Sequence, residues 1–259
     1  MHGKRATVSD DHRRPVNQGI LTVLALALLP AAGNFAGGLV SEFMRPSATL
    51  LNRALHLAAG IIIAIVAVEV MPEAIGSAAS WILALAFVAG GGLYILVEAL
   101  VTRWQRGKED SAGAGAWMVY VAVAADLVGD GLLIGAGSAI SGQLGLLLAF
   151  GQVLADIPEG FAVIANFRDK GVGKKRRLLL SASFAIPVIG AAALAFLVLR
   201  GQSEAIQMTA LVFVSGLYIL AAVEDMLEEA HESEEDSRWS AFSFLGGFAL
   251  FLLVSAGLG

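Results

Sequence analysis

The amino-acid sequence predicts an all-α polytopic membrane protein, and two properties of the chain favour this fold class. Hydrophobic residues make up 57% of the 259 residues and charged residues only 15%, with a mean hydropathy of +0.76. An ordinary soluble domain carries about 25% charged residues. The apolar residues also occur in blocks of about 20, the length at which a helix crosses roughly 30 Å of hydrocarbon.

The apolar blocks predict eight membrane-spanning helices in one transmembrane domain, residues 18–259, after a polar tail at residues 1–17. The tail is charged and has no short apolar region followed by a cleavage site, so we expect no signal peptide. The spans are separated by polar segments, such as the short Ser-Gly-Gln step between the fourth and the fifth. The predicted spans are 18–40, 51–75, 80–103, 116–140, 143–167, 178–199, 206–229 and 240–258.

Lysine and arginine predict the orientation of the eight spans. An even number of spans places both termini on one side, which holds five basic residues, whereas the other side holds twelve. By the positive-inside rule both termini are extracytoplasmic. We interpret the basic segment Lys174–Arg177 as a cytoplasmic loop obeying this rule, rather than as a nucleic-acid or anionic-lipid patch, and we expect no nucleic-acid partner. The chain has no cysteine, which excludes disulfides and thiolate metal ligands.

Four carboxylates lie within the fourth and fifth predicted spans. An aspartate at the centre of a membrane helix costs roughly 2.5–3.5 kcal/mol even on mild scales. Because these two spans contain no lysine or arginine, protons or bound metal cations remain to neutralise the acids. The four residues are Asp126, Asp130, Asp156 and Glu159.

The spacing of these acids places each pair on one helix face, since residues three or four apart are neighbours on a helix. Gln152 extends the face of the fifth span, because 152, 156 and 159 follow an i, i+4, i+7 pattern. Each pair is followed by a glycine, Gly131 or Gly160, which lets a neighbouring backbone come close. Pro158 predicts a kink that frees backbone carbonyls as further oxygen ligands. Two such antiparallel helices are typical of an inverted-repeat site near the membrane midplane.

Two other spans end in acidic segments, which we predict to form an exit path on the basic, cytoplasmic side. The second span ends in VEVMPEAI and the seventh in VEDMLEEAHESEED. Metal would enter from the outer side, bind between the fourth and fifth spans, and leave through these segments. The candidate exit ligands are Glu69, Glu73, Glu224, Asp225 and His231.

These motifs resemble those of the ZIP (Zrt- and Irt-like) family of divalent metal transporters, as in a divergent prokaryotic-type member. The family's fourth-helix motif is similar to Asp126-Leu-Val-Gly-Asp130-Gly-Leu-Leu-Ile-Gly135, and its fifth-helix motif to Asp156-Ile-Pro-Glu-Gly160. Its second-helix ending is similar to Glu69-Val-Met-Pro-Glu73. The resemblance implies an eight-helix ZIP-like bundle in the inner (plasma) membrane, no enzyme activity, no organic cofactor, and a divalent ion (zinc, manganese, iron or cadmium) as substrate. Membrane lipid is the other expected partner, and a homodimer stays open.

The chain departs from the family pattern at several ligand positions. The family's first fourth-helix histidine is Asp126 here, and the positions of three further ligands hold Leu127, Ala155 and Ile186. The resemblance with these losses implies a single metal held by Asp126, Asp130 and Glu159, with Asp156 and Gln152 as further candidates. Carboxylates in place of imidazoles favour harder ions, so Mn²⁺ or Fe²⁺ is expected to compete with Zn²⁺.

Three other functions are alternatives at this stage. The same acids suit a proton- or sodium-coupled carrier of another solute, and the altered ligands suit a non-transporting metal sensor. The distant alternative is an intramembrane aspartyl protease, because Gly129-Asp130 lies in a membrane span. That family's motif resembles Gly-x-Gly-Asp, but position 127 is leucine and the chain has no Tyr-Asp partner or Pro-Ala-Leu stretch.

Overall fold

The computed structural model describes residues 16–44, 47–105, 114–227 and 237–258. Within these ranges the chain is helical and has no β-strand, and eight helical segments are long and apolar enough to cross a membrane. The predicted fold class is therefore confirmed. These segments are Gly19–Phe43, Ala48–Ala74, Ser80–Leu100, Gly115–Ile140, Gly142–Asp169, Lys174–Leu199, Glu204–Glu224 and Arg238–Gly257.

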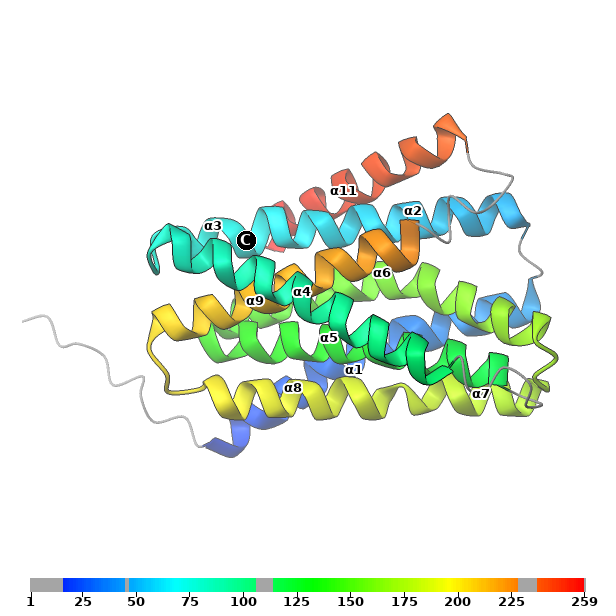
Figure 1. Ribbon diagram of the computed structural model, residues 1–259, viewed down its shortest axis with the longest axis horizontal. Coiled ribbons are helices and arrows are strands. Elements are labelled where there is room, and N and C mark those ends of the chain that lie inside the picture. Colours follow the sequence, from blue (N-terminus) through cyan, green and yellow to red (C-terminus); the bar gives the residue numbers. More distant parts are fainter. Residues whose placement is uncertain (1–15, 45–46, 106–113, 228–236, 259) are drawn as a thin grey trace, which may run out of the picture.

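Three of the eight spans are composed of more than one helical element (Figure 1). Two contain a six-residue π-helix, and one is divided by a turn. In chain order the elements are α1 (Val16–Phe43), α2 (Ala48–Ala64), η1 (Ile65–Val70), α3 (Met71–Ala74), α4 (Ser80–Gln105), α5 (Ala114–Ile140), α6 (Gly142–Asp169), α7 (Lys174–Ser183), α8 (Ala185–Leu199), α9 (Glu204–Ala221), η2 (Ala222–Leu227) and α11 (Arg238–Leu258).

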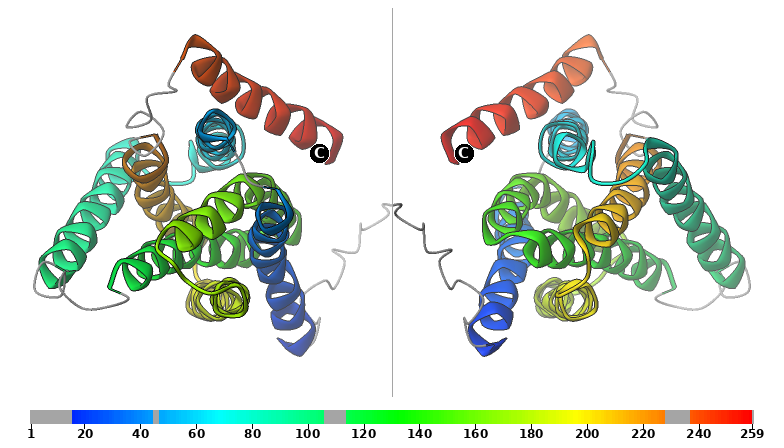
Figure 2. Two further views of the ribbon diagram at one scale, coloured as in Figure 1. Left: turned by 90° about the vertical axis from the view of Figure 1, so that its right-hand side faces the viewer. Right: turned by 90° about the vertical axis from the view of Figure 1, so that its left-hand side faces the viewer.

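The end-on views in Figure 2 place α5 and α6 inside the bundle, with α4 and α11 on its outside. Burial follows this arrangement: in the most apolar stretch of 18 residues of each helix, 72% of α6 is buried, against 11% of α4 and 17% of α11. Most side chains of α4 and α11 therefore face the surroundings of the bundle, whereas Gln152, Asp156 and Glu159 of α6 are buried. This arrangement puts the acidic helices at the centre.

The helices associate in four close pairs: α1 with α6, α5 with α8, α2 with α11, and α4 with α9. In each pair a glycine faces the partner's backbone so closely that an added methyl group would overlap it. Such contacts let helices approach closely in lipid, where small residues favour packing. The contacts are Gly37 with Ile157, Gly131 with Val188, Gly60 with Phe244, and Gly90 with Phe213.

The pairing reveals an inverted repeat, because the first three spans correspond to the last three and α5 corresponds to α6. Three pairs of features have the same spacing in the sequence. Pro187 of α8 lies as far after Pro30 of α1 as η2 lies after η1, and as Gly247 of α11 lies after Gly90 of α4. Four spans lie between each pair of corresponding outer spans, so the members of a pair run in opposite directions (Figure 1). Under this relation the α1–α6 pair matches the α8–α5 pair. The expected inverted-repeat arrangement of the two acidic helices is thus present.

The structure corrects two local predictions. The sixth span begins at Lys174 rather than at 178, so the basic residues Lys174–Arg177 form the first turn of α7 instead of a loop. This span also has a turn at Phe184, between α7 and α8. As predicted, Pro158 lies inside a helix, and α6 is α-helical from Gly142 to Asp169. The missing proline N–H removes one helical hydrogen bond without ending the helix.

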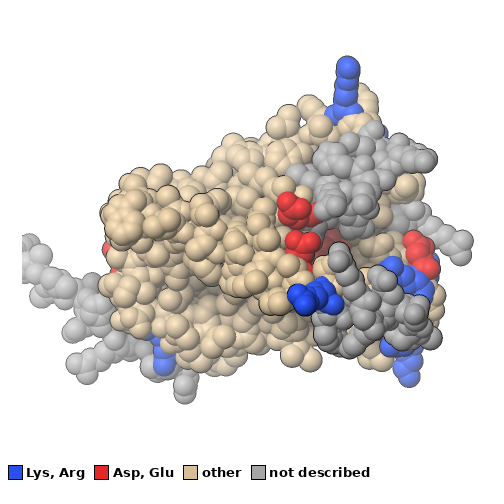
Figure 3. Space-filling model, viewed as in Figure 1, with Lys and Arg blue, Asp and Glu red and all other residues tan. Residues whose placement is uncertain are grey.

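Charged side chains on the described surface gather toward one end of the molecule, and much of the remaining face in Figure 3 is uncharged. At the basic end the guanidinium of Arg177 donates to both carboxylate oxygens of Glu42, over 2.6 and 2.9 Å. It also donates to the carbonyl of Val172 over 2.5 Å. These bonds fasten the C-terminal end of α1 to α7 and to the segment before it.

Candidate metal centre

The central helices α5 and α6 run antiparallel and are joined by a single non-helical residue, Ser141. Its hydroxyl accepts a hydrogen bond from the backbone N–H of Leu144 over 3.0 Å, which caps the start of α6. Ser, Asp and Asn are favoured at this position because they satisfy N–H groups that the first helical turn leaves free. The tight connection fixes the register in which the acids of the two helices face each other.

Three aspartates from these helices converge inside the bundle. Asp126 and Asp130 of α5 and Asp156 of α6 each present a carboxylate oxygen, and the three oxygens lie within 4.8 Å of one another. Asp130 and Asp156 are fully buried, and Asp126 is half-buried. Ligand oxygens bound to a divalent ion at 2.0–2.6 Å lie no more than about 5 Å apart. The triad could therefore bind one divalent metal ion.

Carboxylate oxygens of Asp130 and Asp156 could accept more hydrogen bonds than the described residues donate to them. No hydrogen bond of ordinary geometry from the described residues reaches either carboxylate oxygen of Asp130, or Oδ2 of Asp156. Buried polar groups in proteins are nearly always hydrogen-bonded, and buried carboxylates are paired or coordinate metals. Since α5 and α6 hold no lysine or arginine before Arg168, a cation or protons must balance the charge.

Two further predicted ligands lie at the edge of the triad. Gln152 is fully buried, and its Nε2 donates to the backbone carbonyl of Asp130 over 3.2 Å, while its Oε1 has no donor among the described residues. Glu159 is 7% exposed and lies next to Asp156, one turn further along α6, but it is not among the three converging residues. The structure thus brings Asp156 into the central group in the place predicted for Glu159.

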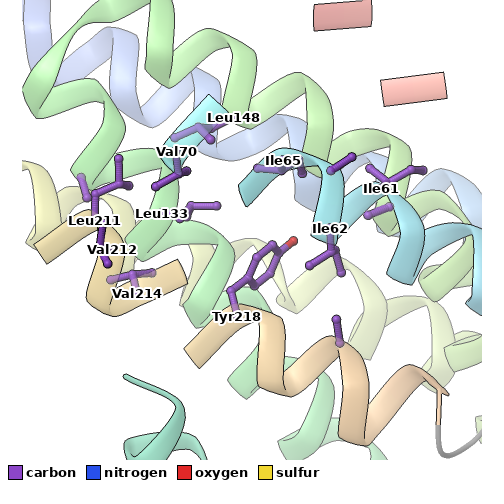
Figure 4. Close-up of a cluster of buried hydrophobic side chains, with 14 of the residues drawn as sticks. Ile61, Ile62, Ile65, Val70, Leu133, Leu148, Leu211, Val212, Val214 and Tyr218 are labelled. Carbon is purple, nitrogen blue, oxygen red and sulfur yellow. The ribbon is translucent and has the colours of Figure 1, made fainter. Parts of the chain in front are cut away.

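Sequence reasoning missed Tyr218 of α9, which adds a hydroxyl to the site. Its side chain is 1% exposed and lies within electrostatic range of all three aspartates. Figure 4 shows its ring directed into the bundle near Leu133 of α5 and Ile62 of α2. The signal available in the sequence was weak: a tyrosine at the centre of an apolar span, where its O–H needs a polar partner.

The positions that lack the family's ligands are occupied by packing residues. Leu127 and Ala155 are fully buried and belong to the two main hydrophobic clusters of the described structure. In the inverted repeat Leu127 corresponds to Asp156 and Ala155 to Asp126, whereas Asp130 corresponds to Glu159. Ile186 of α8 is 74% exposed and does not line the triad's interior. The corresponding positions of α5 and α6 therefore do not all carry acids.

The acidic ends of the second and seventh spans lie at opposite ends of the bundle, so the prediction that both lie on the basic side is wrong. In Figure 1, α3 at the end of the second span lies at the left of the bundle, and the end of the seventh span lies toward the right. The second and seventh spans run in opposite directions, because an odd number of crossings separates them. Among the described residues, Glu224 and Asp225 of η2 remain candidates for the basic side.

The individual acids of these ends differ in their surroundings. Glu69 lies in η1 and accepts a hydrogen bond from the hydroxyl of Ser255 on α11. Glu73 in α3 and Glu224 in η2 are exposed. The prediction for His231 falls outside the described residues. Short π-helical turns within α-helices are frequent at functional sites, and both acidic ends contain one.

A cavity of about 370 Å³ opens beside the triad between α4, α5 and α9. Asp126 lines it together with Tyr94 and Glu98 of α4, and the rest of its wall is mainly apolar. Because Asp126 is the half-buried member of the triad, the cavity gives this carboxylate an opening to the outside of the bundle.

Comparison with known proteins adds no assignment, since neither a family model nor a curated protein matches this chain.

Proposed function

We propose that this chain is a membrane transporter of divalent transition-metal ions, similar to the ZIP family, and that the aspartate triad is its transport site. The observation that carries the proposal is the convergence of Asp126, Asp130 and Asp156 inside a membrane-spanning bundle. Three carboxylates in lipid-enclosed protein are costly unless a cation neutralises them. A transport site must bind and then release its ion, and this accounts for charged ligands at the centre of the bundle.

The ligand set supports a single ion of intermediate hardness. Leu127 and Ala155 lie in the hydrophobic core, so these two positions supply no further ligand, and the three converging oxygens suit one ion. Carboxylate and carbonyl oxygens suit harder ions such as Mn²⁺, whereas imidazole and thiolate ligands suit Zn²⁺, which nevertheless also accepts Asp and Glu. We expect Mn²⁺ or Fe²⁺ to compete with Zn²⁺ and Cd²⁺ for the triad, with Gln152 and Glu159 as additional oxygen ligands.

We expect transport to run inward, into the cytoplasm. The ion crosses from the side of the termini to the basic, cytoplasmic side, and inverted-repeat transporters achieve this by moving one group of helices against another. The cavity between α4, α5 and α9 supports a route to Asp126, since Glu98 lines it as a further carboxylate.

Direct metal binding tests the proposal. Purified protein should bind about one Mn²⁺ or Zn²⁺ per chain, and anomalous scattering should locate the ion between α5 and α6. A proton- or sodium-coupled carrier of another solute would bind no transition metal there. A sensor would bind the metal without moving it, so binding and uptake together separate the three functions.

A further inference from the structure

The cavity between α4, α5 and α9 exists because α4 and α5 do not pack closely against each other. Helix α9 packs against both of them. Glycines bring α4 and α9 together, since Gly90 lies against the backbone of Phe213 and Gly216 lies against that of Phe87. With α4 and α5 both held by α9, a space of about 370 Å³ remains between them.

The wall of this cavity is mainly apolar and also carries acids. Its lining on α5 extends from Val121 to Leu132, roughly 16 Å along the helix. The polar side chains in the wall are Tyr94 and Glu98 of α4 and Asp126 of α5, and the other lining residues are aliphatic or glycine. No lysine or arginine among the described residues lines the cavity. The cavity therefore combines a hydrophobic wall with negative charge.

The two acids lie at different depths in the bundle. Glu98 is exposed and lies near the end of its span, which closes at Leu100. Asp126 lies in the interior of its own span and is half-buried. Along α5 the lining continues past Asp126 to Leu132. A ligand in the cavity would thus meet one carboxylate near the membrane surface, a second at mid-span, and an aliphatic wall beyond.

We infer that this cavity binds an amphipathic organic cation, a protonated amine attached to a hydrophobic body. Sites for small molecules are mostly apolar cavities of about 300–1,000 Å³ with a few placed polar groups. A lipid acyl chain would cover the aliphatic wall but leave the carboxylates beside hydrocarbon, which is costly. An ammonium group would neutralise them, and the ring of Tyr94 can attract it as well.

This site goes beyond the proposed metal transport, because an amine can bind there in the absence of metal. The carboxylate of Asp126 belongs to both the cavity and the triad. The experiments below therefore use protein freed of metal by chelation, so that a failure of metal binding and a failure of this site give different results.

Equilibrium dialysis with three probes of similar shape tests the chemistry of the site. Phenylbutylammonium is a cation, phenylbutanol is neutral and phenylpentanoate is an anion, and all three carry the same phenylbutyl group. The protein is held in lipid nanodiscs, and binding to empty nanodiscs is subtracted. The cation should bind at least about tenfold more tightly than the alcohol, and the anion most weakly, because charges interact strongly in a medium of low dielectric constant. Equal affinities would indicate a site for apolar chains such as lipid acyl groups and would overturn the proposal, as would no binding of the cation.

Substitutions in the wall locate the bound cation. Glu98→Gln removes a charge at an exposed position and should weaken binding of phenylbutylammonium by about tenfold. The same variant should bind phenylbutanol unchanged, which shows that the cavity is intact. Ala125→Leu fills space at an exposed lining position and should weaken binding of both probes. Unchanged binding of the cation to either variant would place it elsewhere and overturn the assignment.

Two matched substitutions outside the cavity serve as controls. Glu204→Gln removes an acid at the start of α9, and Ala241→Leu adds the same bulk on α11. Both positions are exposed and neither lines the cavity. Both control variants should bind the two probes as the unmodified protein does. Losses in the controls equal to those in the cavity variants would contradict a site at Glu98 and Ala125.

Discussion

The side-chain amide of Gln152 donates a hydrogen bond to the backbone carbonyl of Asp130 over 3.2 Å, and this bond joins the two helices that carry the aspartate triad. The bond is buried and lies within the bundle. It leaves Oε1 of Gln152 available as an acceptor or a ligand. Gln152 therefore holds α6 in register with α5 and offers an uncharged oxygen beside three charged ones.

Gln152→Leu should lower the stability of the protein and weaken metal binding. A typical buried hydrogen bond contributes about 1 kcal/mol, so the free energy of unfolding should fall by about that amount. Thermal unfolding in detergent, followed by tryptophan fluorescence, measures the first effect. Titration with Mn²⁺ measures the second. An unchanged unfolding midpoint together with unchanged affinity would contradict a positioning role for Gln152.

Asp130→Asn should stabilise the metal-free protein while abolishing its stabilisation by metal. Neutralising a buried carboxylate that has no cationic partner removes the cost of burying its charge, so the free energy of unfolding without metal should rise. In the unmodified protein, a metal at 100 times its dissociation constant should add about 2.7 kcal/mol. Unfolding midpoints of both proteins with and without Mn²⁺ test both expectations: the variant's midpoint should be higher without metal, and Mn²⁺ should raise only the midpoint of the unmodified protein. A structural role for Asp130 predicts the opposite: loss of stability in the absence of metal.

Gly160→Ala should destabilise the α1–α6 pair, because the added methyl group would overlap the carbonyl oxygen of Asn34. Overpacking of this kind typically costs about 1–3 kcal/mol. Gly246→Ala in α11 is the matched control, since nothing lies within 4 Å of its added methyl group. In that open helical position alanine should be neutral or slightly stabilising. Equal effects of the two changes on the unfolding midpoint would contradict the close packing described here.

Metal binding should weaken as the pH falls, because carboxylates must be ionised to coordinate and therefore release protons when metal binds. Affinity for Mn²⁺ should be lower at about pH 5.5 than at about pH 7.5, and a pH-sensitive dye should report acidification on metal addition to a weakly buffered sample. Asp130→Asn should remove the acidification. Proton release that persists in this variant would place the titrating groups outside the triad.

Much of the fold could be predicted from the sequence because its helices are long, apolar and separated by polar segments. Span boundaries such as 80–103, against Ser80–Gln105 in the structure, depend only on these features. Helical spacing and the short connection predicted that the acids of the fourth and fifth spans face each other. The predicted ligands were Asp126, Asp130 and Glu159, whereas the structure groups Asp156 with the first two. Helix length, spacing and connection length are local features, and local patterns are what a single sequence reveals.

Other parts of the site depend on tertiary packing and could not be predicted in this way. The sequence of α1 is apolar on all sides, so its pattern does not indicate that Asn34 faces α6. Tyr218 reaches the triad from a helix that is distant in sequence. By contrast, counting the membrane crossings is enough to show that the second and seventh spans end on opposite sides. The sequence alone therefore places Glu69 and Glu224 at opposite ends of the bundle.

Uptake of Mn²⁺, Fe²⁺, Zn²⁺ and Cd²⁺ into proteoliposomes tests the central claim most directly. Asp130→Asn and Asp156→Asn should reduce uptake by about a hundredfold or more, because each removes a charged ligand from a buried site. Glu204→Gln, an exposed acid at the start of α9, should leave uptake unchanged. Uptake of one or more of these ions that is lost only in the triad variants is the predicted result. No uptake of any of the four ions by the unmodified protein would contradict the account.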